Sequence, residues 1–366
     1  MRIRIAVFFL WALFHPLDAV GEESSQASKP KAPVEDSHAP HADAYDGAAL
    51  YARYCALCHG ADREGYAADE APSLRSPELI GAASGSFLWS SVSYGRPGTA
   101  MAAFEESQGG PLSHDAQHAL FDWLMSASEV ERNPVKDVPV VGDPELGVEV
   151  YATHCASCHG AKGEGGTGTA VANRVFLATV SDAFIQYTIA NGRQGTPMPG
   201  FSERLSSEEI NNVVAFLRSL AVGWEAGRPV LVAPPDPKNA VLNPGAPPAS
   251  LVEREERFVS SESVAAAMQR GERMVLLDAR PMSDWLRSHL PGALPMPFYD
   301  GVDSLIPHLP KDGTQIIAYC ACPHAASGRV VDALKASGIE SARILDEGVL
   351  FWAKMGYPLA LGAMPQ

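Results

Sequence analysis

The chain has 366 residues, of which 46% are hydrophobic and 19% are charged, and its formal net charge is -15. This length accommodates two or three domains, each with its own core, and the composition is typical of globular proteins. The strong negative charge argues against nucleic acid or an anionic membrane surface as a partner, whereas a basic protein would be attracted.

The first 21 residues have the three parts of a secretory signal peptide. Arg2 and Arg4 precede an apolar run from Ile5 to Phe14, and small residues follow it. Ten apolar residues are too few to span a bilayer. We therefore expect export to the periplasm and a signal peptide over residues 1–21. The alternative is an uncleaved N-terminal anchor, which would be the only attachment to a membrane.

Residues 22–44 are rich in Ser, Pro, Ala, Glu and His and contain hardly any large apolar residues. Such a segment cannot bury a core, so it is predicted to be a disordered tether. His38 and His41 within it are interpreted as solvated side chains.

A helical unit is predicted over residues 45–128. Its opening helix leads into Cys55-Ala56-Leu57-Cys58-His59, and its closing helix covers the segment from Ser113 to Ser128. The CxxCH pattern is typical of covalent haem c attachment. Cys55 and Cys58 are therefore predicted to bind the haem vinyl groups, and His59 to ligate the iron. Zinc half-sites or a disulfide are the alternatives.

A second unit of the same plan is predicted over residues 143–222, after an extended linker over residues 129–142. Its motif is Cys155-Ala156-Ser157-Cys158-His159. Cys155 and Cys158 are the predicted attachment sites and His159 is the predicted axial ligand, so two haem c groups are expected.

Each unit also has a methionine in a glycine-containing loop far from its histidine. Met101 and Met198 occupy equivalent positions in these loops and are the predicted second iron ligands. Met198 lies between two prolines, whereas Met101 lies between two alanines. In an alternative interpretation Met101 is a core residue, and His114 or His118 ligates the first iron.

Arg96 and Arg193 precede these methionines at equivalent positions. A guanidinium there could pair with a haem propionate, and an exposed loop arginine is the alternative. Residues 45–222 contain no cysteine beyond the four attachment residues, which excludes cysteine ligation of the iron from within these units.

A proline-rich linker is predicted over residues 223–255, followed by a domain over residues 256–366. Apolar runs at 274–278 and 315–319 alternate with helical stretches, which is typical of a parallel α/β domain. Cys320 follows the second run and precedes a helix, where backbone N–H groups favour a thiolate. Cys320 is therefore a candidate nucleophile, with Cys322 and His324 as possible supporting residues.

The two helical units resemble class I cytochrome c domains, and their tandem order is similar to that of c4-type dihaem cytochromes. Residues 256–366 resemble the rhodanese family of sulfurtransferases through three segments in the family's order: Leu277-Asp278-Ala279-Arg280, Ser288 to Ala293, and Leu345 to Pro358. The expected fold is thus two all-α cytochrome c domains followed by an α/β rhodanese-like domain with a parallel sheet. The resemblance implies that Cys320 carries sulfane sulfur as a persulfide.

The active loop departs from the rhodanese pattern, because Ala325 stands where the family's usual loop has an arginine. A preference for thiosulfate is therefore not expected. We predict a periplasmic electron carrier with a redox partner protein, linked to sulfur-compound oxidation or sulfur transfer at Cys320 with a small sulfur-containing substrate. The alternatives are an electron carrier with a non-catalytic docking or redox-sensing domain, and a redox switch formed by Cys320 and Cys322.

Overall fold

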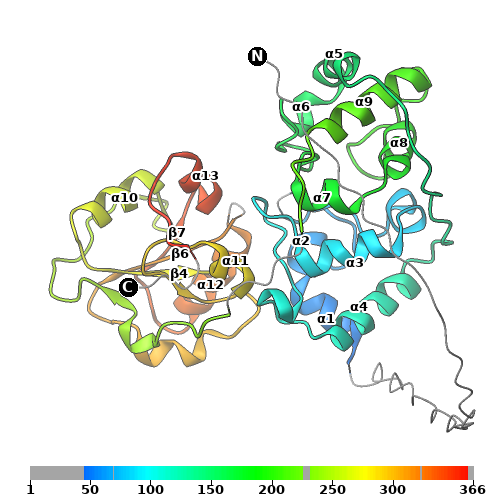
Figure 1. Cartoon of the computed structure of the whole chain (residues 1–366). Coiled ribbons are helices and arrows are strands. Elements are labelled where there is room, and N and C mark those ends of the chain that lie inside the picture. The colour runs from blue at the N-terminus through cyan, green and yellow to red at the C-terminus, as the bar shows by residue number, and fades with distance from the viewer. Residues whose placement is uncertain (1–44, 69, 226–230, 322–323, 362–366) are drawn as a thin grey trace, which may run out of the picture. The chain divides into compact units, whose positions relative to one another are not determined.

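In both helical units the first and last long helices cross (Figure 1). The structure is a computed structural model that describes residues 45–68, 70–225, 231–321 and 324–361. The predicted signal peptide, the predicted tether with His38 and His41, and Cys322 lie outside the described residues. In the described part of the chain, no helix has the length and apolar character needed to cross a membrane.

The helices of the two units follow one order. The first unit contains α1 (Gly47–Tyr54), α2 (Ala56–His59), η2 (Pro77–Gly81), α3 (Gly85–Tyr94), η3 (Glu106–Gln108) and α4 (His114–Ala127). The second contains α5 (Pro144–His154), α6 (Ala156–His159), α7 (Arg174–Thr179), α8 (Asp182–Asn191) and α9 (Ser207–Ser219). Residues 129–142, expected as a linker, have no helix or strand.

Polar side chains cap these helices. The carboxylate of Asp46 accepts hydrogen bonds from the first turn of α1, and that of Asp143 does the same for α5. Ser206 and Glu209 form a reciprocal capping box at the start of α9. The caps satisfy backbone N–H groups that have no partner within the helix, which fixes where each helix begins.

A glycine makes each helix crossing possible. A Cβ added to Gly47 would lie 2.3 Å from the Ala119 carbonyl oxygen of α4, and one added to Gly147 would lie 2.0 Å from the Asn212 carbonyl oxygen of α9. Aromatic rings fill the crossing beside them, with centroids 5.0 Å apart in both Tyr51–Trp123 and Tyr151–Phe216.

The two helical units share a hydrophobic core within the compact unit formed by the described residues 45–361. Phe87 of α3 lies with its ring centroid 5.8 Å from Phe176 of α7 and 5.6 Å from Phe184 of α8. Phe87 and Phe184 are both almost fully buried. Burial of these rings stabilises the pairing of the two units.

The C-terminal domain is built on a seven-stranded sheet with the order β1-β4-β6-β7-β3-β2, and β5 pairs with the last two residues of β4. The central pairs β4–β6, β6–β7 and β7–β3 are parallel, whereas β1 and β2 are antiparallel to their neighbours. The strands are β1 (Val241–Leu242), β2 (Glu253–Arg254), β3 (Phe258–Val259), β4 (Met274–Asp278), β5 (Leu294–Pro295), β6 (Gln315–Tyr319) and β7 (Ala342–Leu345).

Helices cover both faces of this sheet (Figure 1). Side chains of β4 alternate between one core with α12 (Ala325–Ala336) and another with α10 (Ser261–Gln269) and α13 (Gly348–Lys354). The remaining helical segments are η4 (Pro237–Asn239), α11 (Met282–Arg287), η5 (Val302–Ser304) and η6 (Ile306–His308). Burial of both faces explains the continuous apolar runs of β4 and β6.

The sheet extends into the range expected to be a proline-rich linker. β1 pairs with β4, β2 pairs with β3, and Ala240 and Ala249 are buried in the cores. The prolines around β1 are compatible with an edge strand, because one side of an edge strand needs no backbone N–H donors. The domain therefore begins before residue 256.

Candidate haem and thiol sites

The two CxxCH motifs adopt the same short helical turn. The amide of His59 donates to the Cys55 carbonyl oxygen at 2.9 Å, and the amide of His159 donates to the Cys155 carbonyl oxygen at 3.0 Å. In each motif the turn follows directly from the unit's first long helix. The two cysteines and the histidine are therefore held on one rigid element.

A backbone carbonyl orients each motif histidine. Nδ1 of His59 lies 2.8 Å from the Pro72 carbonyl oxygen, and Nδ1 of His159 lies 2.8 Å from the Thr169 carbonyl oxygen. This contact assigns the proton to Nδ1 and leaves Nε2 available as a metal ligand. Burial lowers the pKa of His59, which favours the neutral imidazole that a metal requires.

The methionine loops of the two units repeat one hydrogen-bond pattern. In the first methionine loop (residues 94–104) the Arg96 amide donates to the Met101 carbonyl oxygen, and the Met101 amide donates to Thr99 Oγ1 at 3.2 Å. In the second methionine loop (residues 191–201) the Arg193 amide donates to the Met198 carbonyl oxygen, and the Met198 amide donates to Thr196 Oγ1 at 3.2 Å.

A cavity of about 250 Å³ lies beside the first motif. Its lining includes both cysteines of the motif, the histidine, the loop methionine and an aromatic side chain: Cys55, Cys58, His59, Met101 and Phe104. This lining fits a flat apolar group such as haem c, which the two cysteines would attach and which the histidine and the methionine would ligate.

The alternative ligands of the first iron lie elsewhere. His114 and His118 are exposed on α4, and their rings stack 4.6 Å apart. The ring of His118 also lies 4.6 Å from that of Trp89. Neither histidine lines the cavity that contains Met101.

Arg96 and Arg193 lie on the shared aromatic core rather than in solvent. The Arg96 guanidinium lies 4.8 Å from the Phe176 ring centroid, and that of Arg193 lies 5.9 Å from Phe184. Burial lowers the pKa of each arginine to about 10, and for Arg96 the charge of Arg193 contributes. Nη1 of Arg193 is buried without a hydrogen-bond partner among the described residues. A carboxylate such as a haem propionate fits this unmatched charge.

In the C-terminal domain, Cys320 lies where β6 ends. Its side chain is 1% exposed, and its Sγ lies 3.3 Å from Ser327 Oγ on α12. The Cys320 carbonyl oxygen accepts the Val349 amide at the start of α13. The sulfur is therefore placed between β6 and α12, at the carboxyl edge of the parallel sheet, where ligands bind in such folds.

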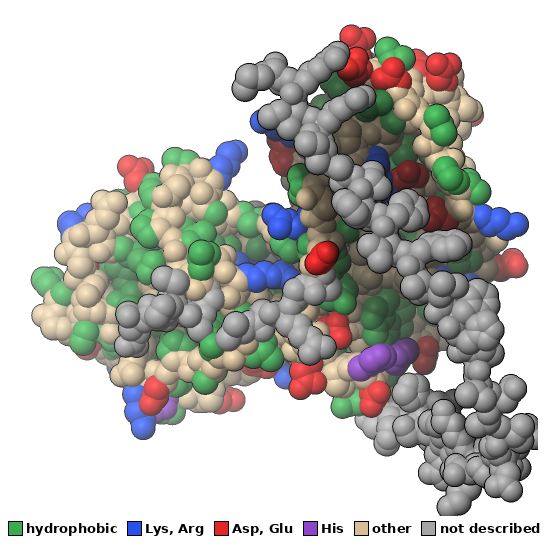
Figure 2. All heavy atoms as spheres, viewed as in Figure 1, with side chains coloured by type: hydrophobic (Ala, Val, Ile, Leu, Met, Phe, Trp, Pro, Cys, Tyr) green, Lys and Arg blue, Asp and Glu red, His purple; other side chains and the backbone are tan. Residues whose placement is uncertain are grey.

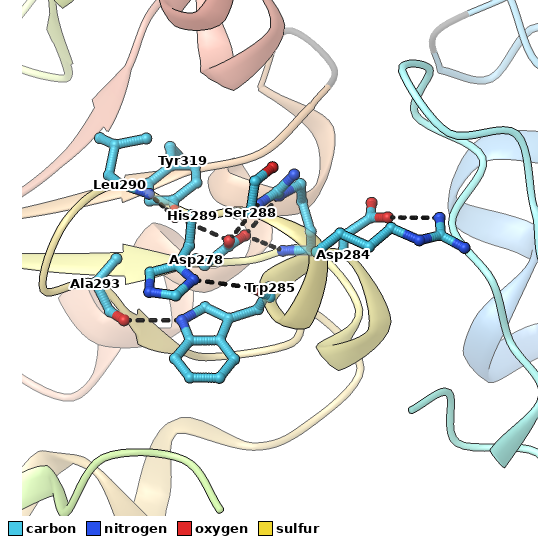
Figure 3. A network of polar contacts seen from close by, with 10 residues as sticks. Asp278, Asp284, Trp285, Ser288, His289, Leu290, Ala293 and Tyr319 are labelled. Carbon is cyan, nitrogen blue, oxygen red and sulfur yellow. Dashed lines mark hydrogen bonds and ion pairs between the residues drawn. The ribbon is translucent and has the colours of Figure 1, made fainter. Parts of the chain in front are cut away.

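A buried polar network fixes the residue before this cysteine (Figure 3). Asp278 accepts from Arg280 Nε at 2.9 Å and from the Tyr319 hydroxyl at 2.8 Å, and that hydroxyl accepts the Leu290 amide at 3.0 Å. Burial raises the pKa of Tyr319, so the phenol stays neutral. Nδ1 of His289 lies 2.9 Å from the Trp285 carbonyl oxygen, so Asp278, Arg280 and His289 are all held by contacts within the domain.

His324 is held by Asp346, a residue that sequence reasoning did not select. Nε2 of His324 lies 2.8 Å from Asp346 Oδ1, and the His324 backbone has a φ of 76° at the start of α12. Burial and the nearby charges of Arg254 and Arg257 lower the pKa of His324. Asp346 follows β7 within the third segment of the rhodanese resemblance, and its place after a parallel strand was the signal available.

Comparison with known proteins finds two family models that match different parts of the chain. A model described as cytochrome c oxidase, cbb3-type, subunit III matches residues 42–124 and 142–217. A model described as rhodanese-like domain matches residues 260–355. These matches confirm the predicted fold class, with a helical cytochrome c region followed by an α/β domain.

Relatives of the helical half are cytochrome subunits. The chain is 26% identical over 195 residues to the Cbb3-type cytochrome c oxidase subunit CcoP of Azospirillum sp. (strain B510). The match covers 48% of this chain and 62% of that subunit. It therefore spans less than two thirds of that relative. It is 34% identical over 95 residues to cytochrome c6 of Limnospira maxima, which covers 23% of this chain and 100% of that cytochrome.

Among solved structures, the C-terminal domain is similar to the rhodanese-like domain of the Anabaena sp. Alr3790 protein. The sequence identity is 26%, the TM-score is 0.27, and the match covers 31% of this chain and 86% of that domain.

Proposed function

The chain belongs to the cytochrome c family and carries a C-terminal rhodanese-like domain, and from this premise we propose that it is an exported two-haem electron carrier joined to a sulfur-handling domain. The observation that carries the first part is the duplicated site. Both units hold CxxCH, an oriented histidine and a methionine loop through the same hydrogen bonds.

The residues of each unit have distinct roles in this proposal. Cys55 and Cys58, like their counterparts in the second unit, would anchor haem c, and His59 and Met101 would ligate its iron. Haem iron supplies one-electron redox chemistry when bound. The protein contributes a fixed ligand set, and Arg96 and Arg193 offer positive charge to propionates.

The sulfur-handling role rests on Cys320 at the end of β6. The Cys320 thiolate attacks the outer sulfur of a persulfide donor RSS⁻, the donor S–S bond breaks, RS⁻ leaves, and an enzyme persulfide forms. When sulfide is the substrate, forming the same Cys320–S–S⁻ species from thiolate and HS⁻ releases one proton and two electrons. Two one-electron centres match this stoichiometry.

The closing test measures reduction of the full-length haem protein by sulfide, followed by visible absorption, because only the sulfide step releases electrons. We expect the Cys320→Ser variant to be reduced at least about tenfold more slowly, a loss of about 1.4 kcal/mol in transition-state stabilisation. Reduction by ascorbate serves as the control and should be equal in both proteins. Equal sulfide-dependent rates would refute the coupling and leave the electron carrier.

A second candidate function is a cytochrome whose rhodanese-like domain docks a partner or senses redox state. The 1% exposure of Cys320 and the presence of Ala325 in place of the loop arginine favour it. Absence of sulfur transfer to cyanide by the full chain, with undiminished electron transfer, would select this candidate. A mass decrease of two hydrogens on oxidation, abolished in Cys322→Ser, would select the thiol switch.

Export to the periplasm is part of the same proposal. The signal-like sequence before residue 22 supports it. The mass of the mature protein, isolated from the periplasmic fraction, should correspond to cleavage near Ala19 or Gly21. An intact N-terminus in a membrane fraction would instead support the anchor.

A further inference from the structure

The first methionine loop accepts a hydrogen bond from a side chain of the second helical unit, and the second methionine loop donates one to a side chain of the first. Nδ2 of Asn173, in the second unit, donates to the Pro97 carbonyl oxygen of the first methionine loop at 2.9 Å. Oε2 of Glu78, in the first unit, accepts from the Gln194 amide of the second methionine loop at 3.0 Å. In the first contact a side chain of the second unit meets the loop of the first, and in the second contact a side chain of the first unit meets the loop of the second. We call this pair of contacts the cross-brace.

The Asn173 end of the cross-brace is fixed by a helix cap. Oδ1 of Asn173 accepts from the amides of Val175 at 3.1 Å and Phe176 at 3.3 Å at the start of α7. These donors assign the oxygen to the cap and therefore the NH₂ group to Pro97. Asn173 is 9% exposed, so water competes little for this bond.

The Glu78 end is fixed by its own helical turn. Ser76 Oγ donates to the same oxygen, Oε2, at 2.8 Å. The carboxylate is half-buried beside the second loop. Its charge also raises the pKa of Arg193, although burial lowers that pKa more. A hydrogen bond from an amide to a charged acceptor is stronger than a neutral one.

Each contact lies next to the aromatic core of Phe87, Phe176 and Phe184. Asn173 bonds the Phe176 amide, and Gln194 follows Arg193, whose guanidinium lies over Phe184. Packed cores of this kind move as units rather than deform continuously. A displacement of one unit therefore reaches the opposite loop through the cross-brace.

We propose that Asn173 and Glu78 are positioning residues that each act on the methionine loop of the neighbouring unit. This rests on the proposed ligation by Met101 and Met198. Asn173 supports the loop of Met101, and Glu78 supports the loop of Met198. Loss of either bond loosens the thioether–iron contact of the opposite unit. Because methionine ligation raises the reduction potential, that unit's potential falls.

The test uses the full-length holoprotein with Asn173→Asp and Glu78→Ala. Asn173→Asp keeps the capping oxygen and removes the donor to Pro97. Because it also adds a negative charge, the charge-transfer band, rather than the potential alone, reports the loss of this hydrogen bond. Glu78→Gln retains an oxygen acceptor and serves as the rescue variant, and exposed Glu203→Ala is the matched control for loss of one carboxylate. The readouts are the two reduction potentials and the methionine-to-iron charge-transfer absorption. Met101→His and Met198→His assign each potential to its unit.

We expect Asn173→Asp to lower the potential of the first unit and Glu78→Ala that of the second, each with a weakened charge-transfer band in the shifted unit only. Glu78→Gln should restore most of the shift, and Glu203→Ala should leave both potentials unchanged. Shifts confined to the unit that carries the substitution, or no shifts with intact bands, would overturn the cross-brace. Absence of the band in the unmodified protein would instead refute methionine ligation itself.

Discussion

At the residue scale, single glycines and buried polar groups decide how the candidate sites are held. Gly192 opens the second methionine loop with a φ of 70°, and an added Cβ would lie 2.4 Å from the Gly200 amide nitrogen. Gly195 in the same loop has a φ of 75° and open space around it. Substitutions at these two positions therefore distinguish the effect of backbone strain, which both would have, from that of a steric collision, which only a substitution at Gly192 would have.

We predict that Gly192→Ala displaces Met198 and weakens the charge-transfer band of the second unit, because the new methyl group collides with backbone. Gly195→Ala is the matched control, which should cost about 1 kcal/mol for its backbone conformation and keep the band. Absorption spectra and thermal unfolding of both variants provide the measurement. Equal spectra in the two variants would contradict the steric argument.

His289 predicts a pH dependence of the C-terminal domain. Its pKa is lowered, mainly by burial, while the Trp285 carbonyl opposes the shift. The unfolded chain therefore binds a proton more readily, so stability is full above the unfolded pKa of about 6.5 and is lost as the pH falls towards the folded value. Burial raises the pKa of Asp284, which acts in the opposite direction.

We accordingly expect the unfolding temperature of this domain to fall between pH 7.5 and pH 5.5, and His289→Gln to flatten that change. Calorimetry of the full chain at both pH values is the measurement. An unchanged slope in the variant would show that other groups cause the dependence. The comparison of variant with unmodified protein cancels the contribution of Asp284.

At the element scale, the two helical units use equivalent parts that differ in sequence. Arg218 on α9 donates to carbonyls at the end of α7, and Arg132, beyond α4, does so at the end of η2. The carbonyls belong to Leu177 and Val180 in the second unit, and to Ile80 and Ala83 in the first. Arg218 lies within a helix, whereas Arg132 lies in an extended segment. The two arginines therefore do not occupy equivalent positions in the sequences of the two units.

The crossing of α5 and α9 supplies a prediction for this scale. Gly147→Ala would place a methyl group against the Asn212 carbonyl and force the helices apart, at a cost of about 2 kcal/mol or more. Gly85→Ala, at a helix start with nothing within 4 Å, is the control and should be neutral or stabilising. Denaturant unfolding monitored by haem absorption compares them. Equal losses in both variants would refute close helix contact.

At the scale of the whole molecule, charge governs encounters. The chain has a formal net charge of -15, and acidic side chains gather on the surface over α5 and α9 (Figure 2). Glu145 and Glu149 are exposed on α5, and Glu208 is exposed on α9. A field of this sign attracts cations and repels anions over about one Debye length.

Oxidation by two small complexes of opposite charge tests this field. We expect the rate with a cationic ruthenium hexaammine to fall as ionic strength rises, and the rate with anionic ferricyanide to rise. Stopped-flow measurements on the reduced protein, between about 10 and about 500 mM salt, give the salt dependence of the rate for each oxidant. Parallel salt dependences for both oxidants would exclude electrostatic steering.

The sequence by itself determined the parts whose signals are local. Two CxxCH motifs, two methionine loops and helix caps depend on a few adjacent residues, and the apolar runs at 274–278 and 315–319 became β4 and β6. The edge strand β1 was missed, because two residues between prolines have no periodicity and are defined only by pairing with β4. The orientation of His59 by the Pro72 carbonyl was also beyond local patterns.

Only the tertiary structure decided how distant segments meet. It placed Arg96 and Arg193 on an aromatic core, set Asp346 against His324, and joined each methionine loop to the opposite unit through Asn173 and Glu78. These pairs lie up to 116 residues apart. Such distant residues interact only after folding has overcome the entropic cost of bringing their segments together. Composition and local spacing therefore do not predict these contacts.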